Sequence, residues 1–279
     1  MTSSAIFKDK IHAVFVAEIV FYSLAFLVTL ASFARRGKMT SIKLYLLLLI
    51  SLKLAGTSLS LRAAVQIVNS GDGTMSNGTT VLFIVGGVLT SVASAPLIRC
   101  TRVLLPSLPK KQHPDQPLLE RLLSNLPRLT LIAAIATSAA GYGQLSGSTS
   151  TAEKGIKIVQ ASSILFLAGY LMLLAAGLLA FKTSHSDWPP IKLYGVAIAF
   201  PFFILRFIYI IISAFSLTGN LLEYHKFSVL NGDWRPYLGM FVVMDFCIVI
   251  IYLAMAYIAP PSDSREPSSE KRKYFNRYV

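Results

Sequence analysis

Five ionisable residues lie inside segments of the chain that are otherwise apolar: Glu18, Lys53, Arg62, Arg206 and Asp245. A charged side chain is costly in the hydrocarbon region of a bilayer, so such residues tend to face the interior of a helix bundle and to pair with one another. A buried carboxyl group in that setting can give or accept a proton. A buried arginine can neutralise an acid or hold an anionic group. These residues are therefore the first candidates for chemistry.

Four of them are predicted to lie at one depth. If the segments are helices, Glu18, Arg62, Arg206 and Asp245 lie roughly 9 to 14 Å below the outer surface, at a rise of about 1.5 Å per residue. Two acids and two bases at one level balance in charge. We therefore predict a polar pocket that opens toward the outer side. The structural alternative is a set of ion pairs that fixes helix packing without binding anything.

Tyrosines accompany these charges at helical spacing. Tyr22 follows Glu18 by four residues and Tyr209 follows Arg206 by three, so each pair shares a helix face. Their hydroxyl groups are candidates for orienting a bound molecule. Lys53 is set apart, because it lies nearer the inner end of its segment. We expect its long side chain to reach the inner membrane interface.

The elements that must position these residues follow from composition. Of the 279 residues, 54% are hydrophobic and 14% are charged, against about 25% charged in soluble domains. A membrane-spanning helix needs about 20 mostly apolar residues. We predict an all-α bundle of seven transmembrane helices in one domain, residues 1–260, followed by a disordered basic tail, residues 261–279. The predicted helices are 11–34, 44–68, 80–105, 123–144, 156–181, 191–215 and 237–259.

The distribution of Lys and Arg predicts the direction of these helices. The net charge is +13, but the basic residues are spread over short loops, which is how membrane topology is encoded and not how a nucleic-acid-binding face is built. Most of them fall in alternate loops and in the carboxyl-terminal tail. The positive-inside rule then places the amino terminus outside or in the lumen and the carboxyl terminus in the cytosol.

Several chemistries have no motif in the chain. The four histidines do not cluster as metal ligands, and no P-loop or Gly-x-Gly-x-x-Gly turn is present. An aspartate-rich run that would hold magnesium on a diphosphate is also missing. We expect no cofactor and no metal. A cyclisation in this protein would have to be started by a protein acid.

Three stretches carry a resemblance: Ala34-Arg35-Arg36-Gly37, residues 206–213, and Asp245 within residues 242–257. Over nearly its whole length the chain resembles a family of small seven-helix fungal membrane proteins of largely unknown function. In size and layout it is also similar to the membrane-bound terpene cyclases of fungal meroterpenoid pathways, of the ascofuranone and macrophorin type.

The second resemblance implies an acid-initiated terpene cyclase of secondary metabolism. A lipophilic, farnesylated substrate would enter from the bilayer of the endoplasmic reticulum. A carboxylic acid would protonate its epoxide or alkene, and aromatic faces would stabilise the carbocations. Asp245 is the preferred donor, because Phe241, Phe246 and Ile248 flank it, and Glu18 is its partner. If Arg206 pairs with one acid, the other is left as the donor.

Six residues therefore form the predicted site: Asp245, Glu18, Arg206, Arg62, Tyr209 and Tyr22. Two other functions use the same pocket. A seven-helix receptor would bind a small ligand there, and a proton-coupled transporter would use Glu18 and Asp245 as a relay. The transporter is favoured least, because no internal repeat is evident.

Overall fold

The computed structural model describes residues 2–36, 41–69, 77–105, 118–145, 149–183, 190–217, 227 and 233–258. Every regular element in this part of the chain is helical. The predicted tail, residues 261–279, lies outside the described residues. The elements are α1 (Thr2–Arg36), α2 (Ser41–Asn69), α3 (Asn77–Val92), α4 (Ser94–Leu104), α5 (Leu118–Gln144), α6 (Thr149–Thr183), α7 (Pro190–Phe215), α8 (Trp234–Pro236), the π-helix η1 (Tyr237–Val242) and α9 (Val243–Ile258).

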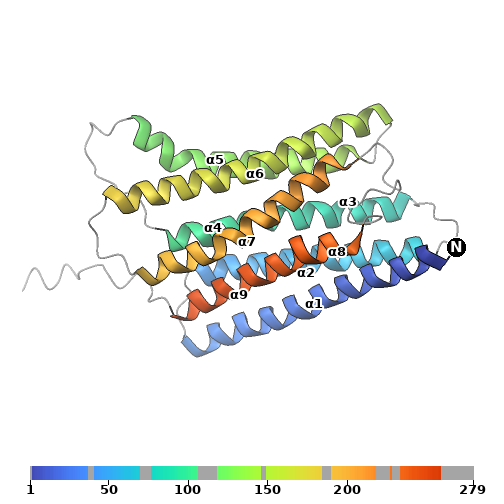
Figure 1. Cartoon of the computed structure of the whole chain (residues 1–279), viewed down its shortest axis with the longest axis horizontal. Coiled ribbons are helices and arrows are strands. Elements are labelled where there is room, and N and C mark those ends of the chain that lie inside the picture. The colour runs from blue at the N-terminus through green and yellow to red at the C-terminus, as the bar shows by residue number, and fades with distance from the viewer. Residues whose placement is uncertain are drawn as a thin grey trace, which may run out of the picture.

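The long helices run roughly along one axis (Figure 1). Helices α5 and α6 lie side by side along one edge of the bundle, and α1 lies along the opposite edge with α2 and α9 beside it. Helices α3, α4 and α7 lie between these two groups. Every predicted apolar stretch is helical, so an all-α fold is confirmed.

Within the described residues, six helical segments are long and apolar enough to cross a membrane. They are Lys10–Ser32, Ser41–Ile67, Gly78–Leu104, Ser150–Phe181, Ile191–Phe215 and Trp234–Ile258. Helix α5 is not among them. It carries Arg128 near its middle, and its later part, from Thr137 to Gln144, is rich in small and polar residues. A count of seven spans therefore stays a prediction.

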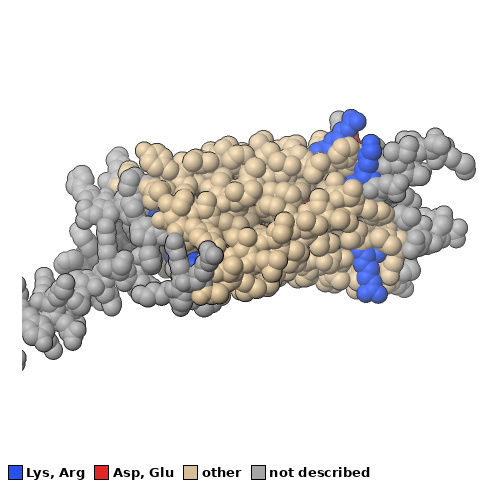
Figure 2. Space-filling model, turned by 90° about the horizontal axis from the view of Figure 1, so that it is seen from below, with Lys and Arg blue, Asp and Glu red and all other residues tan. Residues whose placement is uncertain are grey.

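Many large hydrophobic side chains are exposed on the outer surface of the bundle. Figure 2 shows a broad face without charged side chains, and the Lys and Arg side chains in view gather toward the ends. Large side chains such as Leu27 and Leu178 are each 61% exposed. A surface of this extent would be unfavourable in water and is stable against lipid chains.

Proline divides the third predicted helix. The chain forms α3 and α4 with a turn at Ala93, three residues before Pro96. Because Pro96 has no N–H, the carbonyl of Val92 loses its helical partner and the helix bends. The bend makes Ser94 the first residue of α4, where its side chain is buried in the bundle.

Glycine allows α2 and α3 to approach closely. A Cβ atom on Gly56 would lie 2.8 Å from Thr90 Oγ1, and one on Gly86 would lie 2.6 Å from Ser60 Oγ. Small residues permit such close helix contacts in membranes. The contact brings the hydroxyl groups of α2 next to those of α3, on the side where the site lies.

Candidate functional site: a buried charge cluster beside a hydroxyl-lined cavity

Asp245 lies between two cations in the middle of the bundle. Its Oδ2 atom lies 2.5 Å from Lys53 Nζ, and its Oδ1 atom lies 3.0 Å from Arg206 Nε. Tyr22 donates a hydrogen bond of 2.7 Å to Oδ2. All four side chains are fully buried, and they come from α9, α2, α7 and α1. Two adjacent cations and a hydroxyl donor stabilise the ionised carboxylate.

The position of Lys53 corrects the expectation that it reaches the inner membrane interface. The side chain is completely buried and is directed to Asp245. Lys53 shares its helix face with Thr57, four residues later, and that face is turned to the interior. The attraction of the Lys53 ammonium group to the nearby Asp245 carboxylate outweighs the hydration that it would gain at the membrane interface.

Glu18 is the second buried acid and has a different environment. It is 2% exposed and accepts hydrogen bonds from Thr57 Oγ1 at 3.1 Å and from Tyr237 Oη at 3.3 Å. Among the described residues, no Lys, Arg or His nitrogen lies within 4.0 Å of it. Lys53 acts on Glu18 through its charge at longer range.

Lys53, Arg206, Asp245 and Glu18 together form the charge cluster, and its charges balance only when Glu18 is ionised. Lys53, Arg206 and Asp245 together carry one excess positive charge. The cluster is neutral when Glu18 is ionised and carries +1 when Glu18 holds a proton. Glu18 is therefore the acid whose protonation decides the net charge of the site.

Arg62, the fourth member of the predicted set, does not join the cluster. Its side chain is exposed. Arg62 follows Lys53 by nine residues, which is a rotation of about 180° around the helix at 3.6 residues per turn. Because Lys53 faces the interior, Arg62 faces away from it.

Phe241 lies between the two cations and belongs to the π-helical segment η1. Lys53 Nζ is 4.4 Å from the centre of its ring and the Arg206 guanidinium is 5.3 Å from it. Both distances fit cation–π contacts. Short π-helical segments often occur at functional sites, and this one also supplies Tyr237, whose ring stacks on Phe241 with centroids 5.5 Å apart.

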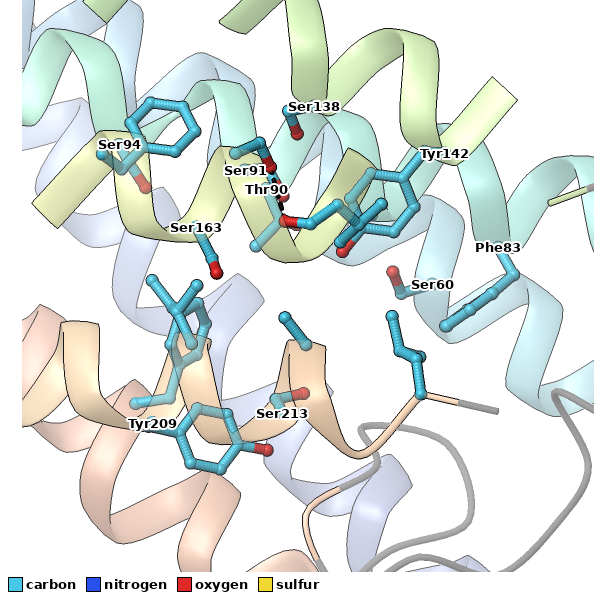
Figure 3. A pocket seen from close by; sticks show the side chains of 18 of the residues that line it. Ser60, Phe83, Thr90, Ser91, Ser94, Ser138, Tyr142, Ser163, Tyr209 and Ser213 are labelled. Atoms are coloured by element: carbon cyan, nitrogen blue, oxygen red, sulfur yellow. Dashed lines mark hydrogen bonds between the residues drawn. The ribbon is translucent and has the colours of Figure 1, made fainter. Parts of the chain in front are cut away.

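A cavity of about 120 Å³ adjoins the cluster. Its wall combines aromatic rings with many hydroxyl groups, several of which point toward one another (Figure 3). Among the described residues that line it, none is Lys, Arg, His, Asp or Glu. The hydroxyl-bearing residues are Thr57, Ser60, Thr90, Ser91, Ser94, Ser138, Tyr142, Ser162, Ser163, Tyr209, Ser213 and Tyr237.

Hydroxyl groups connect the charge cluster to the cavity. Thr57 and Tyr237 line the cavity and both donate to Glu18. Ser94 lines it too and accepts a hydrogen bond of 3.0 Å from Arg206 Nη2. A molecule in the cavity therefore meets three neutral hydroxyl groups, those of Thr57, Tyr237 and Ser94, that a charged group polarises from behind.

The structure brings together most of the predicted site and adds five residues that were not part of the prediction. Glu18, Arg206, Asp245 and Tyr22 meet as described. Tyr209 lines the cavity and donates to the carbonyl of Phe227 at 3.3 Å. Thr57, Ser94 and Tyr237 were not singled out from the sequence, and Lys53 and Phe241 were named but not placed in the site. The four-residue spacing from Lys53 to Thr57, and from Tyr237 through Phe241 to Asp245, was a signal that could have found most of them.

The fold and the buried site define the class: a multi-pass integral membrane protein built of helices. Residues 9–260 match the family model described as "Domain of unknown function (DUF7702)", and the chain belongs to that family. No match was found among curated proteins or among solved structures. Membership in a family of unknown function is thus confirmed, whereas the seven-helix and fungal character of that family and the similarity to terpene cyclases stay predictions.

Proposed function

We propose that this protein is a membrane-bound cyclase that starts catalysis by protonating an uncharged, prenylated substrate. The observation that carries the proposal is the contrast between its two buried acids. Asp245 is held as a carboxylate by Lys53 and Arg206, and Glu18 is bonded to neutral hydroxyl groups beside the cavity. The donor is therefore Glu18 and not Asp245, which was preferred from the sequence.

Tyr237 gives Glu18 a route to the substrate. In the protonated state Glu18 donates to Tyr237 Oη, which reverses the hydrogen bond seen in the structure and turns the tyrosine hydroxyl proton to the cavity. Glu18 then passes its proton to Tyr237 Oη as the tyrosine gives its own proton to an epoxide oxygen or an alkene carbon. The epoxide C–O bond breaks, or the π bond of the alkene is used for the new C–H bond, and neighbouring alkenes attack the resulting cation to close the rings. The last carbocation loses a proton to Tyr237 Oη, which passes its own proton back to the Glu18 carboxylate, and this completes an isomerisation with no change in mass.

The charge distribution favours this proton transfer. When Glu18 loses its proton, its carboxylate is stabilised by the excess positive charge of the Lys53, Arg206 and Asp245 group. The carbocation is stabilised when it lies against the face of an aromatic ring. Phe241 already contacts two cations, so Phe15, Phe166 and Tyr209 are the rings of the cavity wall that would serve.

The proposal includes the predicted topology. Seven spans would place the amino terminus in the lumen and the carboxyl terminus in the cytosol, in the endoplasmic reticulum. Helix α5 would be the seventh span. Its exposed side carries Leu126, Leu129 and Ile132, which suits contact with lipid, and its opposite side supplies Ser138 and Tyr142 to the cavity.

The size of the cavity favours a second candidate function. A cavity of about 150 Å³ takes up benzene in an engineered protein, and the cavity here is of similar size, about 120 Å³. A farnesyl chain must therefore extend beyond it or displace part of its wall. A receptor-like protein that binds a small neutral ligand needs no such change.

A product assay separates these functions. Microsomes containing the wild type, Glu18→Gln, Asp245→Asn or the exposed control Glu153→Gln are incubated with farnesyl-phenol epoxides. We expect the wild type and Glu153→Gln to form a cyclic isomer of unchanged mass, seen by mass spectrometry and NMR. Glu18→Gln should lose at least about 100-fold in rate, as for removal of a general acid. If the folded wild type converts no epoxide, the cyclase proposal fails and the receptor-like function is favoured.

A further inference from the structure

The hydroxyl groups of the cavity wall differ in how their hydrogen bonds are satisfied. Thr57, Tyr237 and Ser94 contact the charge cluster. On α6, Ser162 and Ser163 donate to carbonyl groups of their own helix, at 2.8 and 2.7 Å. Such hydroxyl groups have already used their protons.

Ser138 on α5 differs from all of these. It is 1% exposed, it lines the cavity, and its Oγ atom has no hydrogen-bond partner among the described residues. Figure 3 shows its hydroxyl directed toward the cavity and not along its helix. An unsatisfied buried hydroxyl group is costly, so its partner is expected to be a bound molecule or water.

The position of Ser138 separates it from the acid. Glu18 belongs to α1, and α5 lies on the opposite edge of the bundle, with other helices between them. Both groups reach the same cavity, Glu18 through Thr57 and Tyr237, and Ser138 directly. A molecule that spans the cavity can contact both walls.

We infer that the natural ligand is an uncharged molecule with two separated oxygen functions, one facing Tyr237 and a second that accepts a hydrogen bond from Ser138. The inference rests on the proposed function for the role of the first oxygen. Because no charged side chain lines the cavity among the described residues, a carboxylate or phosphate would lack a counter-charge there. The second oxygen is therefore that of a phenol, alcohol or ketone.

Two probes that cannot be cyclised through an epoxide test this inference. They are 4-farnesylphenol, which carries the second oxygen, and farnesylbenzene, which lacks it. Equilibrium binding of each tritiated probe is measured on the purified full chain in nanodiscs. The variants are Ser138→Ala and the matched control Thr137→Ala, whose hydroxyl is satisfied by the carbonyl of Ala133.

We expect Ser138→Ala to weaken 4-farnesylphenol by about five- to tenfold, the effect of losing one hydrogen bond, and to change farnesylbenzene by less than about twofold. Thr137→Ala should change neither. Without ligand, Ser138→Ala should melt at or above the wild-type temperature, because the substitution removes an unsatisfied polar group.

Equal weakening of both probes, no weakening of either, or no binding of 4-farnesylphenol to the wild type would overturn the inference. So would a lower melting temperature of unliganded Ser138→Ala, since it would show that the hydroxyl is satisfied within the protein. These results are separate from the turnover assay. If epoxides are not converted but Ser138→Ala selectively weakens 4-farnesylphenol, the cyclase proposal fails and the second oxygen contact stands.

Discussion

The Asp245→Asn substitution tests the buried charge cluster most directly, because it removes the negative charge that Lys53 and Arg206 share. At the observed separations of 2.5 and 3.0 Å, Coulomb's law with an effective dielectric constant of about 20 gives roughly 7 and 6 kcal/mol for the two attractions. Desolvation of the ions offsets much of this gain. Ionisation of Glu18 would supply part of the missing negative charge. The expected net loss is about 3–5 kcal/mol, the usual effect of leaving a buried charge unpaired.

Thermal unfolding of purified protein measures this loss. We expect Asp245→Asn to lower Tm by roughly 6 to 15 °C. Lys53→Met should cost less, because it leaves a one-to-one pair of Asp245 and Arg206. The double variant, with both substitutions, should be more stable than the sum of the two single losses predicts, by at least about 1 kcal/mol, since the residues are in contact.

The matched control is Glu153→Gln, which neutralises an exposed acid on α6 and should stay within about 0.5 kcal/mol of the wild type. If Asp245→Asn melts like this control, the two ion pairs do not stabilise the bundle. If the double variant is simply additive, Lys53 and Asp245 are not coupled. Either result would refute the arrangement of the cluster.

Three further predictions address the site and its frame. Tyr237→Phe keeps the ring that stacks on Phe241 but removes the hydroxyl group between Glu18 and the cavity. In the epoxide assay we expect kcat to fall about 100-fold and KM to change by less than about threefold. An unchanged kcat would exclude proton transfer through Tyr237. Arg62→Gln should leave turnover within about twofold, because Arg62 is exposed on the opposite face of α2 from Lys53; a loss comparable to that of Glu18→Gln would restore Arg62 to the site. Gly86→Val should lower stability by about 1–3 kcal/mol in thermal unfolding, because its Cβ would lie 2.6 Å from Ser60 Oγ, and a wild-type Tm would mean that α2 and α3 are not in close contact.

The sequence alone determined the helical architecture. Whether a stretch can cross a bilayer depends on its own length and composition, so each predicted apolar stretch could be recognised without knowing its neighbours. Six of the seven predicted helices correspond to segments that meet this criterion in the part of the chain that the structure describes. Helix α5 does not, because small and polar residues dilute its hydropathy. The break at Ala93 was readable from Pro96 in principle, since the missing N–H is a local property.

The sequence also indicated that Glu18, Arg206 and Asp245 would face the interior, because an isolated charge is unfavourable in lipid. It did not determine the partners. Only the packing of four helices shows that Asp245 holds both cations and that Glu18 is bonded to Thr57 and Tyr237.

Helix α2 shows most clearly what the tertiary structure decided. Spacing places Lys53 and Arg62 on opposite faces of this helix, so the two cannot both point to the same site. Which face is turned inward depends on the rotation of α2 about its axis. That rotation is fixed by close contacts with other helices, such as Gly56 against α3 and Lys53 against Asp245. Contacts between residues far apart in the chain have no counterpart in local spacing, and for this reason the site became visible only when the helices were assembled.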